Sequence, residues 1–324
     1  MKTVKLLLIS LMGLIWVNIA VAATLPGALV ETNWLAKNQD KVVILDIRYD
    51  LQSFTEKPVF RRDIRTGESK LRKVAGHIPG AIMVNYRKLR AGKSINGRKV
   101  IKMIVSKSAF EKLMQASGVN KKSAVVIVSK GQSNGDVTMA TRLYWQMKYY
   151  GHDNMAILNG GMAQWLVDKR AVSSKEAKVK KGNWVATAER NEILATSQDV
   201  EAAVKAKSQL VDTRPISFYL GLRRKNSYVF LDGHIPGAKL YPNELLTTKM
   251  PAKFLKTSDS KSLFEQLGIK TNKKSITYCN SGNLSTGSWF IMSELIGNKN
   301  VKMYDGSMHQ WTLEKHDVTK MKME

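Results

Sequence analysis

The chain contains one cysteine, Cys279, in the stretch ITYCNSGNLSTGSW (276–289). Three residues typical of a strand precede it, small polar residues and Gly282 follow, and an apolar stretch with helical spacing comes next. A turn from strand to helix leaves backbone N–H groups free, and these groups together with the helix dipole stabilise negative charge on the sulfur. Because the thiolate is the nucleophilic form of cysteine, the stretch predicts a reactive, solvent-accessible thiol. The same turn could hold a persulfide or a bound oxyanion.

Two interpretations of this thiol stay open at this point. Unpaired cysteine is among the most buried residue types, so Cys279 could be an inert core residue. The residues after it, 280–285, are small and polar apart from Leu284, which indicates a turn rather than core. A thiolate in a cradle of amides serves phosphatases, redox thiols and sulfur-transfer enzymes. CNSGNLST has no arginine for phosphate and the chain has no second cysteine, so sulfur transfer fits best.

The N-terminal residues predict export. Lys2 and Lys5 precede an apolar run from Leu6 to Val21 that small residues close, as in a cleaved signal peptide over 1–22. An uncleaved anchor is the alternative, but the run is shorter than the roughly 20 residues that a spanning helix needs. We therefore expect a periplasmic or secreted protein whose mature part does not span a membrane.

The mature chain is strongly basic. Removing the two lysines of the signal leaves 50 basic and 26 acidic residues, a formal charge of 50 − 26 = +24. A solvated lysine-rich surface explains this charge, and attraction to anions or acidic membranes is the alternative. The lysines are scattered and accompany no nucleic-acid-binding motif, so we expect no nucleic-acid partner.

The mature chain also repeats itself. Five pairs of matching segments occur in the same order. The pairs are KVVILDIR (41–48) with QLVDTR (209–214), GHIPGA (76–81) with GHIPGA (233–238), SAFEKLMQASGV (108–119) with SLFEQLGI (262–269), AVVIVS (124–129) with SITYC (275–279), and LNGGMAQW (158–165) with YDGSMHQW (304–311). We therefore expect two domains, 24–171 and 192–324, joined by a linker over 172–191.

Within each copy, short strands alternate with amphipathic segments, which predicts an α/β fold with a mainly parallel sheet flanked by helices. Such sheets bind ligands beyond the carboxyl ends of their strands, where Cys279 would lie at the seam between the lobes. In the first copy, Ser129 takes the place of the cysteine.

These motifs, in this order, resemble the tandem rhodanese family, the sulfurtransferases typified by thiosulfate sulfurtransferase and mercaptopyruvate sulfurtransferase. The resemblance covers essentially the whole mature chain. It implies two rhodanese-like domains, of which only the second is catalytic. Cys279 would take sulfur from a small anionic donor, keep it as a persulfide, and pass it to cyanide or a thiol. The resemblance implies no cofactor and no metal, and we expect a monomer.

The resemblance also implies site residues, although it leaves the donor open. Thiosulfate enzymes carry cations in the cysteine loop and mercaptopyruvate enzymes carry a serine; this loop lacks the cations, has the serine, and departs from both at its fifth and sixth positions. The loop residues are Asn280, Ser281, Gly282, Asn283, Leu284 and Ser285. The donor-binding candidates are Arg214, Arg223 or Arg224, and His77, which would form a relay with Ser281.

Alternatives to these roles remain. Arg214 could form an internal salt bridge, and the GHIPGA histidine could be a fold element. Two further functions stay open for the whole protein. It could be a non-catalytic rhodanese-like pair that binds an anion or a protein, or a persulfide carrier that releases sulfur only to a dedicated protein.

Overall fold

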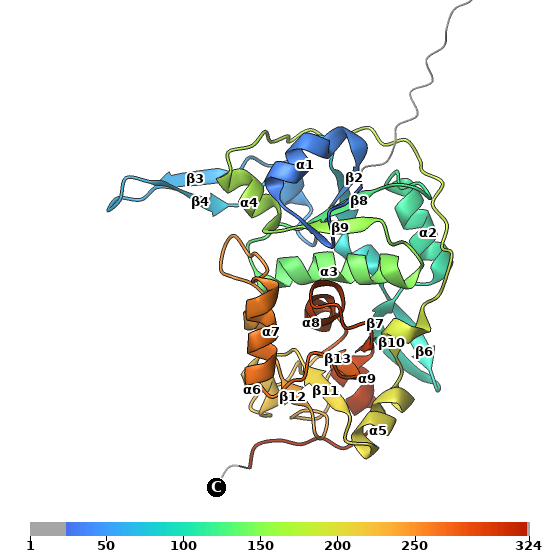
Figure 1. The fold of residues 1–324 in the computed structure, drawn as a ribbon. Coiled ribbons are helices and arrows are strands. Elements are labelled where there is room, and N and C mark those ends of the chain that lie inside the picture. Colours follow the sequence, from blue (N-terminus) through green and yellow to red (C-terminus); the bar gives the residue numbers. More distant parts are fainter. Residues whose placement is uncertain (1–23, 323–324) are drawn as a thin grey trace, which may run out of the picture.

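Two parallel β-sheets, one from each half of the chain, organise the computed structural model, which describes residues 24–322 (Figure 1). The first sheet has the strand order β1-β9-β8-β2-β5, and the second has the order β10-β14-β13-β11-β12. The first contains β1 (Leu29–Val30), β2 (Val43–Arg48), β5 (Ile82–Asn85), β8 (Val125–Val128) and β9 (Met155–Leu158). The second contains β10 (Leu194–Ala195), β11 (Gln209–Asp212), β12 (Lys239–Leu240), β13 (Ser275–Tyr278) and β14 (Val301–Tyr304).

The two sheets correspond strand for strand. Neighbouring strands are parallel in both, and the repeat seen in the sequence maps β2 onto β11 and β8 onto β13. The central strands β8 (VVIV) and β13 (SITY) are buried throughout, as expected for parallel strands covered on both faces. The predicted α/β fold of two tandem domains is therefore confirmed.

Helices cover the sheets. The first lobe contains α1 (Thr32–Asn38), α2 (Lys107–Ala116), α3 (Asn134–Tyr149) and α4 (Gly161–Val167). The second contains α5 (Ser197–Lys205), α6 (Ile216–Tyr219), α7 (Thr257–Gln266), α8 (Leu284–Phe290) and α9 (Ser307–Leu313). None of the helices within 24–322 is long and apolar enough to cross a membrane, and the predicted signal peptide, 1–22, lies outside the described residues.

Helix α3 forms the centre of the contact between the lobes. It begins with a capping box, in which the Ser133 hydroxyl accepts from the Asp136 N–H and the Asp136 carboxylate accepts from the Ser133 N–H. Figure 1 shows α3 lying across the end of α8, between the two sheets. Because α3 packs on its own sheet and on the second lobe, nearly all its residues are buried, including Arg142.

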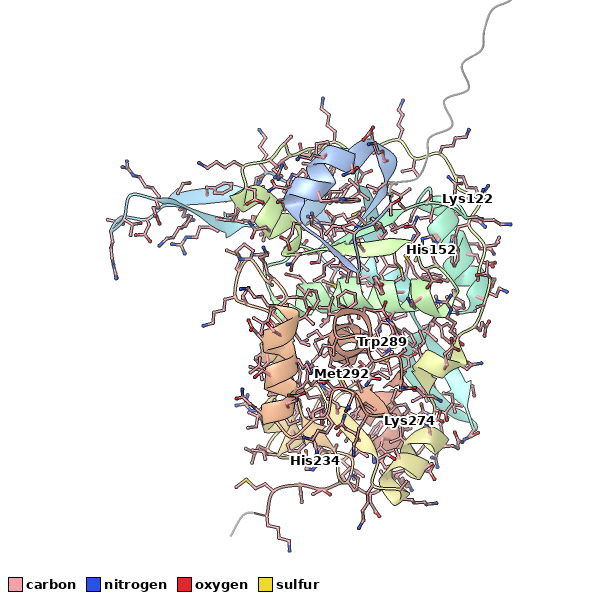
Figure 2. All side chains as sticks on the ribbon, viewed as in Figure 1. Lys122, His152, His234, Lys274, Trp289 and Met292 are labelled. Carbon is pink, nitrogen blue, oxygen red and sulfur yellow. The ribbon has the colours of Figure 1, made fainter. Side chains whose placement is uncertain are left out.

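The largest hydrophobic cluster includes residues of both lobes, so the lobes share a core. The rings of Tyr144 and Phe290 meet edge to face across the contact, with centroids 4.9 Å apart. Figure 2 shows Trp289 and Met292 inside the molecule, whereas Lys122 and Lys274 lie at its surface among many other lysines. This shared core fixes the position of one lobe relative to the other.

Two antiparallel hairpins interrupt the first repeat. One, β3 (Val59–Arg62) with β4 (Ser69–Lys73), projects from the first lobe as an arm (Figure 1). The other, β6 (Arg90–Ile95) with β7 (Arg98–Ile104), turns at Asn96-Gly97, where φ is 49° and 75°. Positive φ at both central residues is typical of a two-residue hairpin turn. Hairpin β6–β7 packs against α9 of the second lobe.

Segment 172–191, predicted as a linker, runs along the first lobe. Ser173 exchanges two backbone hydrogen bonds with His77, and the N–H of Trp184 donates to the Val119 carbonyl. The Trp184 ring is 2% exposed and packs edge to face on Phe110. A buried tryptophan thus anchors the segment to the first lobe, which the charged composition of the segment did not indicate.

Candidate active site

Cys279 lies immediately after β13 and five residues before α8, as the strand-to-helix prediction requires. The start of α9 supports this loop from the other side. The N–H of Met308 donates to the Cys279 carbonyl and the N–H of His309 donates to the Asn280 carbonyl, each at 3.0 Å. The loop is therefore held by α9 and continues along the chain into α8.

The thiol is buried rather than open to solvent. Cys279 is 1% exposed, so the expectation of an accessible sulfur is wrong for this structure. The physical reason is that α3 and hairpin β6–β7 of the first lobe cover the loop. The surroundings are nevertheless polar, because the Ser285 hydroxyl lies 3.6 Å from Sγ and Asn280 and Ser281 are also buried beside it. The surroundings of Cys279 are therefore polar and not the hydrocarbon packing of an ordinary core cysteine.

Ser307 holds the cysteine loop in its curled shape. Its hydroxyl accepts hydrogen bonds from the N–H of Cys279 at 3.1 Å and of Gly282 at 3.0 Å, and it donates to the Tyr304 carbonyl at 2.8 Å. Gly282 has φ +69°, the backbone conformation for which glycine was expected there. Among residues 24–322, no protein acceptor takes the backbone N–H of Asn280, Ser281 or Asn283. Within the described residues, Sγ of Cys279 accepts a hydrogen bond only from the Ser285 hydroxyl, at 3.6 Å, so the three amides have no protein acceptor, the sulfur included.

Ser307 carries backbone strain for this role. Its φ is +51°, a left-handed conformation that costs a residue other than glycine about 1–3 kcal/mol. The first lobe has Gly161 at the matching position, with φ +56°. The second lobe thus keeps the strained backbone and adds a hydroxyl, where the first lobe has no side chain.

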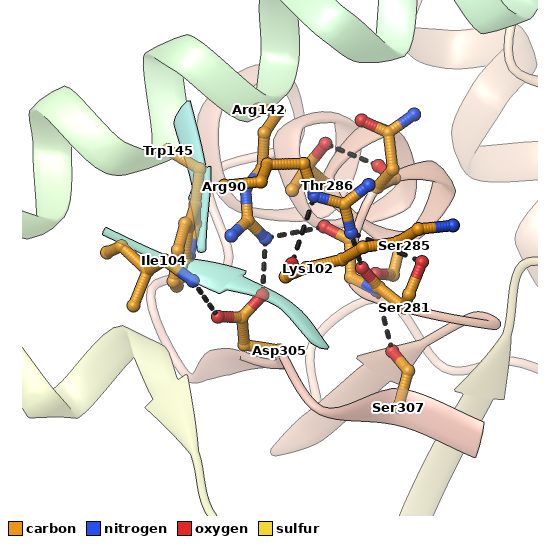
Figure 3. A network of polar contacts seen from close by, with 12 residues as sticks. Arg90, Lys102, Ile104, Arg142, Trp145, Ser281, Ser285, Thr286, Asp305 and Ser307 are labelled. Carbon is orange, nitrogen blue, oxygen red and sulfur yellow. Dashed lines mark hydrogen bonds and ion pairs between the residues drawn. The ribbon is translucent and has the colours of Figure 1, made fainter. Parts of the chain in front are cut away.

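A buried ion pair from the first lobe supports the loop (Figure 3). Arg142 of α3 donates to the Asp305 carboxylate at 2.5 Å and to the Gly282 carbonyl at 2.6 Å. Both side chains are 0% exposed. Asp305 also accepts from the N–H of Ile104 in hairpin β6–β7 at 2.7 Å. One carboxylate therefore joins a helix and a hairpin of the first lobe to the loop before α9.

Arg90, the first residue of β6, reaches the cysteine loop directly. Its guanidinium donates to the Ser281 carbonyl and lies 3.2 Å from the Ser281 hydroxyl. It also donates to the Tyr86 hydroxyl, which donates in turn to the Asn283 side chain at 2.6 Å. The Asn283 amide then donates to Thr138 of α3 at 3.0 Å. The unusual asparagine in this loop is thus explained by contacts with the other lobe.

His309 joins hairpin β6–β7 to the second lobe, and its hydrogen bonds define its tautomer. Its Nε2 accepts from the N–H of Ile101 at 3.0 Å, so Nδ1 carries the proton and donates to the Tyr228 carbonyl at 2.6 Å. Burial lowers the pKa of His309, which favours this neutral form.

The lobes cover each other reciprocally. Ile104 of the first lobe donates to Asp305 of the second, and Phe254 of the second donates to Asn159, the matching residue of the first, at 3.0 Å. The loop around Ser129 resembles the cysteine loop, because the N–H of Met162 donates to the Ser129 carbonyl at 2.8 Å. Segment 247–254 covers that loop, and the N–H of Ala252 donates to the Gly131 carbonyl. The serine site is thus closed by another segment and has no thiol.

Arg214 follows β11 and forms a buried ion pair with Asp212 at the end of that strand. Its guanidinium donates to the Asp212 carboxylate at 2.6–3.0 Å and to the Gly233 carbonyl at 2.8 Å. Burial opposes the charge, but the carboxylate outweighs it and raises the pKa of Arg214. Arg48 makes the same contacts with Asp46 in the lobe without a cysteine. This duplication favours the internal salt bridge, and a donor-binding role for Arg214 stays a prediction.

Arg223 and Arg224 lie on the surface in the loop after α6. The Arg224 guanidinium pairs with Asp232 at 2.7 Å, and both side chains are about one-third exposed. The backbone N–H of Arg223 donates to the Ser217 carbonyl. Their predicted contact with a donor stays untested.

His77 does not meet Ser281 in this structure. The ring stacks on Phe54 with centroids 3.7 Å apart, and its nitrogens face the carbonyls of Phe54 at 2.8 Å and Lys175 at 3.1 Å. The Ser281 hydroxyl faces Arg90 instead. His234 of the second box stacks on Tyr219 in the same way. The structure therefore forms no relay between His77 and Ser281, and it favours the role of the box as a fold element.

Sequence reasoning missed Arg90, Arg142, Asp305 and Ser307. One signal for Arg142 was present, since it is an arginine within the otherwise apolar stretch VTMATRLYWQM. Arg90 and Asp305 gave none, because their partners are 163–201 residues away in sequence. Ser307 gave none either, although its partners Cys279 and Gly282 are only 28 and 25 residues away. No group of acidic, histidine and cysteine side chains within 24–322 could hold a metal ion. A cavity of about 720 Å³ lies at the amino ends of β13 and β14, away from Cys279.

Comparisons with known proteins agree with this geometry. The model of the rhodanese-like domain family matches residues 31–168 and 196–314. The sulfur carrier protein TtuD of Thermus thermophilus is 28% identical over 297 residues, which cover 88% of this chain and 94% of that protein. A putative thiosulfate sulfurtransferase of Haloferax volcanii is 30% identical over 239 residues, covering 72% of this chain and 80% of that protein.

Two solved structures show the same fold. The 3-mercaptopyruvate sulfotransferase SseA of Escherichia coli has a TM-score of 0.67 at 23% identity, covering 87% of this chain and 98% of that chain. The anaerobic ergothioneine biosynthesis enzyme of Chlorobium limicola has a TM-score of 0.72 at 18% identity, covering 91% of this chain and 71% of that chain. The chain therefore belongs to the rhodanese family, and it is a sulfurtransferase built from two rhodanese-like domains in tandem.

Proposed function

We propose that the protein moves a sulfur atom, the sulfane sulfur of thiosulfate or the thiol sulfur of 3-mercaptopyruvate, to cyanide or a thiol, through a persulfide on Cys279. One observation carries this proposal. The cysteine that only the second lobe has lies in a loop curled around a strained serine, with three backbone amides that have no acceptor among the described residues. The names of relatives, among them putative thiosulfate sulfurtransferases, support the same chemistry.

With thiosulfate the reaction has two displacement steps. The Cys279 thiolate attacks the outer sulfur of the donor, a new sulfur–sulfur bond forms, the donor's own breaks, and sulfite leaves with the electron pair. Cyanide then attacks the outer sulfur of the persulfide, thiocyanate leaves, and the thiolate is restored. Splitting the transfer in this way is covalent catalysis. The unpaired amides of the loop would stabilise the charge on sulfur in both states.

The proposal includes export to the periplasm or the exterior, as a monomer without metal or cofactor. The basic, apolar and small-residue pattern of residues 1–22 supports export. Cell fractionation checks it: the protein should be shortened by the signal and recovered outside the cytoplasm. Full-length protein in the cytoplasm contradicts this part of the proposal and leaves the chemistry standing.

Mass spectrometry tests the persulfide. The purified, reduced protein is treated with thiosulfate or mercaptopyruvate, and one added sulfur atom is expected on the peptide containing Cys279. Adding cyanide should remove that sulfur and yield an equal amount of thiocyanate. Cys279→Ser is the control, and it should take up no sulfur while keeping the wild-type melting temperature to within a few degrees. An unmodified Cys279 with both donors contradicts the proposal.

A second function is favoured by one comparison. The sulfur carrier protein TtuD of Thermus thermophilus matches nearly the whole chain, and the Cys279 thiol is 1% exposed. A carrier would load sulfur and release it only to a partner protein. The same experiment separates the two functions, since a carrier forms the persulfide but gives no thiocyanate when cyanide is added.

A further inference from the structure

Lys102 occupies a strained position in hairpin β6–β7. Ala91 pairs with Met103 and Lys93 pairs with Val100, so two residues of β7, Ile101 and Lys102, oppose one residue of β6. This is a β-bulge, and Lys102 within it has φ +62°. Bulges near active sites redirect side chains, and left-handed backbone at residues other than glycine tends to occur where function requires it.

The bulge directs Lys102 at the second lobe. Its Nζ lies 3.9 Å from the centre of the Tyr228 ring, and its carbonyl accepts from the Arg90 guanidinium at 3.0 Å. The neighbouring Ile101 N–H donates to His309, which donates to the Tyr228 carbonyl. His309 thus links the backbone next to Lys102 with the backbone of Tyr228. Figure 3 shows Lys102 beside Arg90 and Ser281 at the edge of the cysteine loop.

Tyr228 connects this ammonium group to the sulfur. Burial raises the pKa of the Tyr228 hydroxyl, a hydrogen bond with Ser281 lowers it in part, and charge on Cys279 raises it further. Tyr228 therefore lies near Ser281 and Cys279, and its ring contacts the Lys102 ammonium group.

Three cations gather here, and none of them is paired with a carboxylate among the described residues. Burial, followed by the charges of Arg90 and Lys225, lowers the pKa of Lys102. Within the part of the chain that the structure describes, Arg90, Lys102 and Lys225 form no ion pair. Arg90 and Lys102 are half-buried and Lys225 is exposed. Mutual repulsion of the two half-buried cations is unfavourable, and an anion bound among them relieves it.

We propose that Lys102, supplied by the first lobe, binds the anionic end of the sulfur donor at Cys279, with Lys225 at the outer rim. This inference rests on the proposed function and specifies it. The cysteine loop itself has no cation, yet both candidate donors are anions. The first lobe is thus a functional part of the site, and the charge that the loop lacks comes from a strained residue of the other domain.

Steady-state kinetics of Lys102→Met test the assignment. Methionine keeps the length and the β-carbon of the side chain and removes the charge. We expect KM to rise about tenfold for thiosulfate and less for mercaptopyruvate, with kcat within about twofold, since about 1.4 kcal/mol of binding is a factor of ten. Lys102→Arg should recover most of the affinity. Lys99→Met, an exposed lysine of the same hairpin, is the matched control and should leave KM unchanged.

An alkylation experiment needs no turnover. Iodoacetate and iodoacetamide modify the same thiol, but only iodoacetate is an anion. In Lys102→Met the rate with iodoacetate should fall at least fivefold relative to wild type, while the rate with iodoacetamide stays within about twofold. Equal changes with both reagents, or no change with either, overturn the role of Lys102 even if the enzyme forms a persulfide. A wild-type thiol that reacts with neither reagent overturns it also, because anions then have no route past Lys102 to the sulfur.

The two tests separate failure of the inference from failure of the proposed function. If wild-type protein forms no persulfide but shows the charge-dependent alkylation, the anion site stands and the sulfur transfer fails. If persulfide forms and Lys102→Met matches the wild type in KM and in both alkylation rates, the transfer stands and the role of Lys102 is refuted.

Discussion

Replacing Arg142 by methionine should destabilise the protein far more than an ordinary change in α3. The substitution leaves the Asp305 carboxylate buried with no cation and removes the donor to the Gly282 carbonyl. Breaking a buried ion pair in this way costs about 3–5 kcal/mol. Two other nitrogens of Arg142, Nε and Nη2, are buried without partners, and losing them offsets part of this cost. We therefore expect a loss near the lower end, about 3 kcal/mol.

Urea unfolding followed by tryptophan fluorescence measures this loss. The matched control is Lys148→Met, which removes another cation of α3 that pairs with the second lobe, at Glu294. Lys148 is partly exposed, so its removal should cost only about 0–1 kcal/mol. The double variant Arg142→Met/Asp305→Asn removes both charges and should lose about 1–2 kcal/mol less than the sum of the single variants.

Two results would refute this reasoning. Equal losses for Arg142→Met and Lys148→Met would mean that burial of the pair carries no special weight. Strict additivity in the double variant would mean that Arg142 and Asp305 do not interact. Arg142→Met should also slow persulfide formation, because the Gly282 carbonyl loses its donor and the cysteine loop loses its support from the first lobe.

Two more predictions concern the cysteine loop and pH. Ser307→Gly keeps the left-handed backbone but removes the acceptor for the amides of Cys279 and Gly282. Persulfide formation should therefore slow at least tenfold in protein that still folds. A wild-type rate would show that the hydroxyl does not position the loop. Burial lowers the pKa of His152, His234 and His309. Below about pH 6.5 these histidines therefore bind protons in the unfolded chain while they stay neutral in the folded chain. The free energy of unfolding should therefore be greatest above that pH and fall as the pH drops through the lowered folded values, and His309→Gln should flatten the dependence. A urea midpoint that stays constant or rises on acidification argues against these assignments.

Much of the fold was predictable from the sequence because its signals are local. The paired segments ending in LDIR and VDTR, and the two GHIPGA boxes, each produce the same strand or turn in both lobes. The turn after Cys279 was readable from glycine and small polar residues, since few backbone conformations fit between a buried strand and a helix.

The composition of the site was only partly predictable. Hairpin β6–β7 corresponds to segment 247–254 of the second repeat, which forms only the single bridge between Thr247 and Phe254, and the bulge of the hairpin leaves no pattern that predicts positive φ at Lys102. His77 was a candidate because the resemblance to the family implies a relay between the histidine of the first GHIPGA box and Ser281. In the structure, its ring stacks on Phe54 in the first lobe. Spacing along the chain gives no information on which lobe a side chain faces.

By itself, the sequence determined the duplication, the α/β class and the single thiol at the end of a strand, because periodicity and turn residues act over a few positions. The tertiary structure alone decided what surrounds that thiol. Arg142 and Arg90 reach the cysteine loop from the other lobe, Lys102 reaches Tyr228, and these partners are 126–191 residues away in sequence. Such contacts form only when two separately encoded surfaces pack together, so charge, burial and access at Cys279 are properties of the assembled pair of lobes.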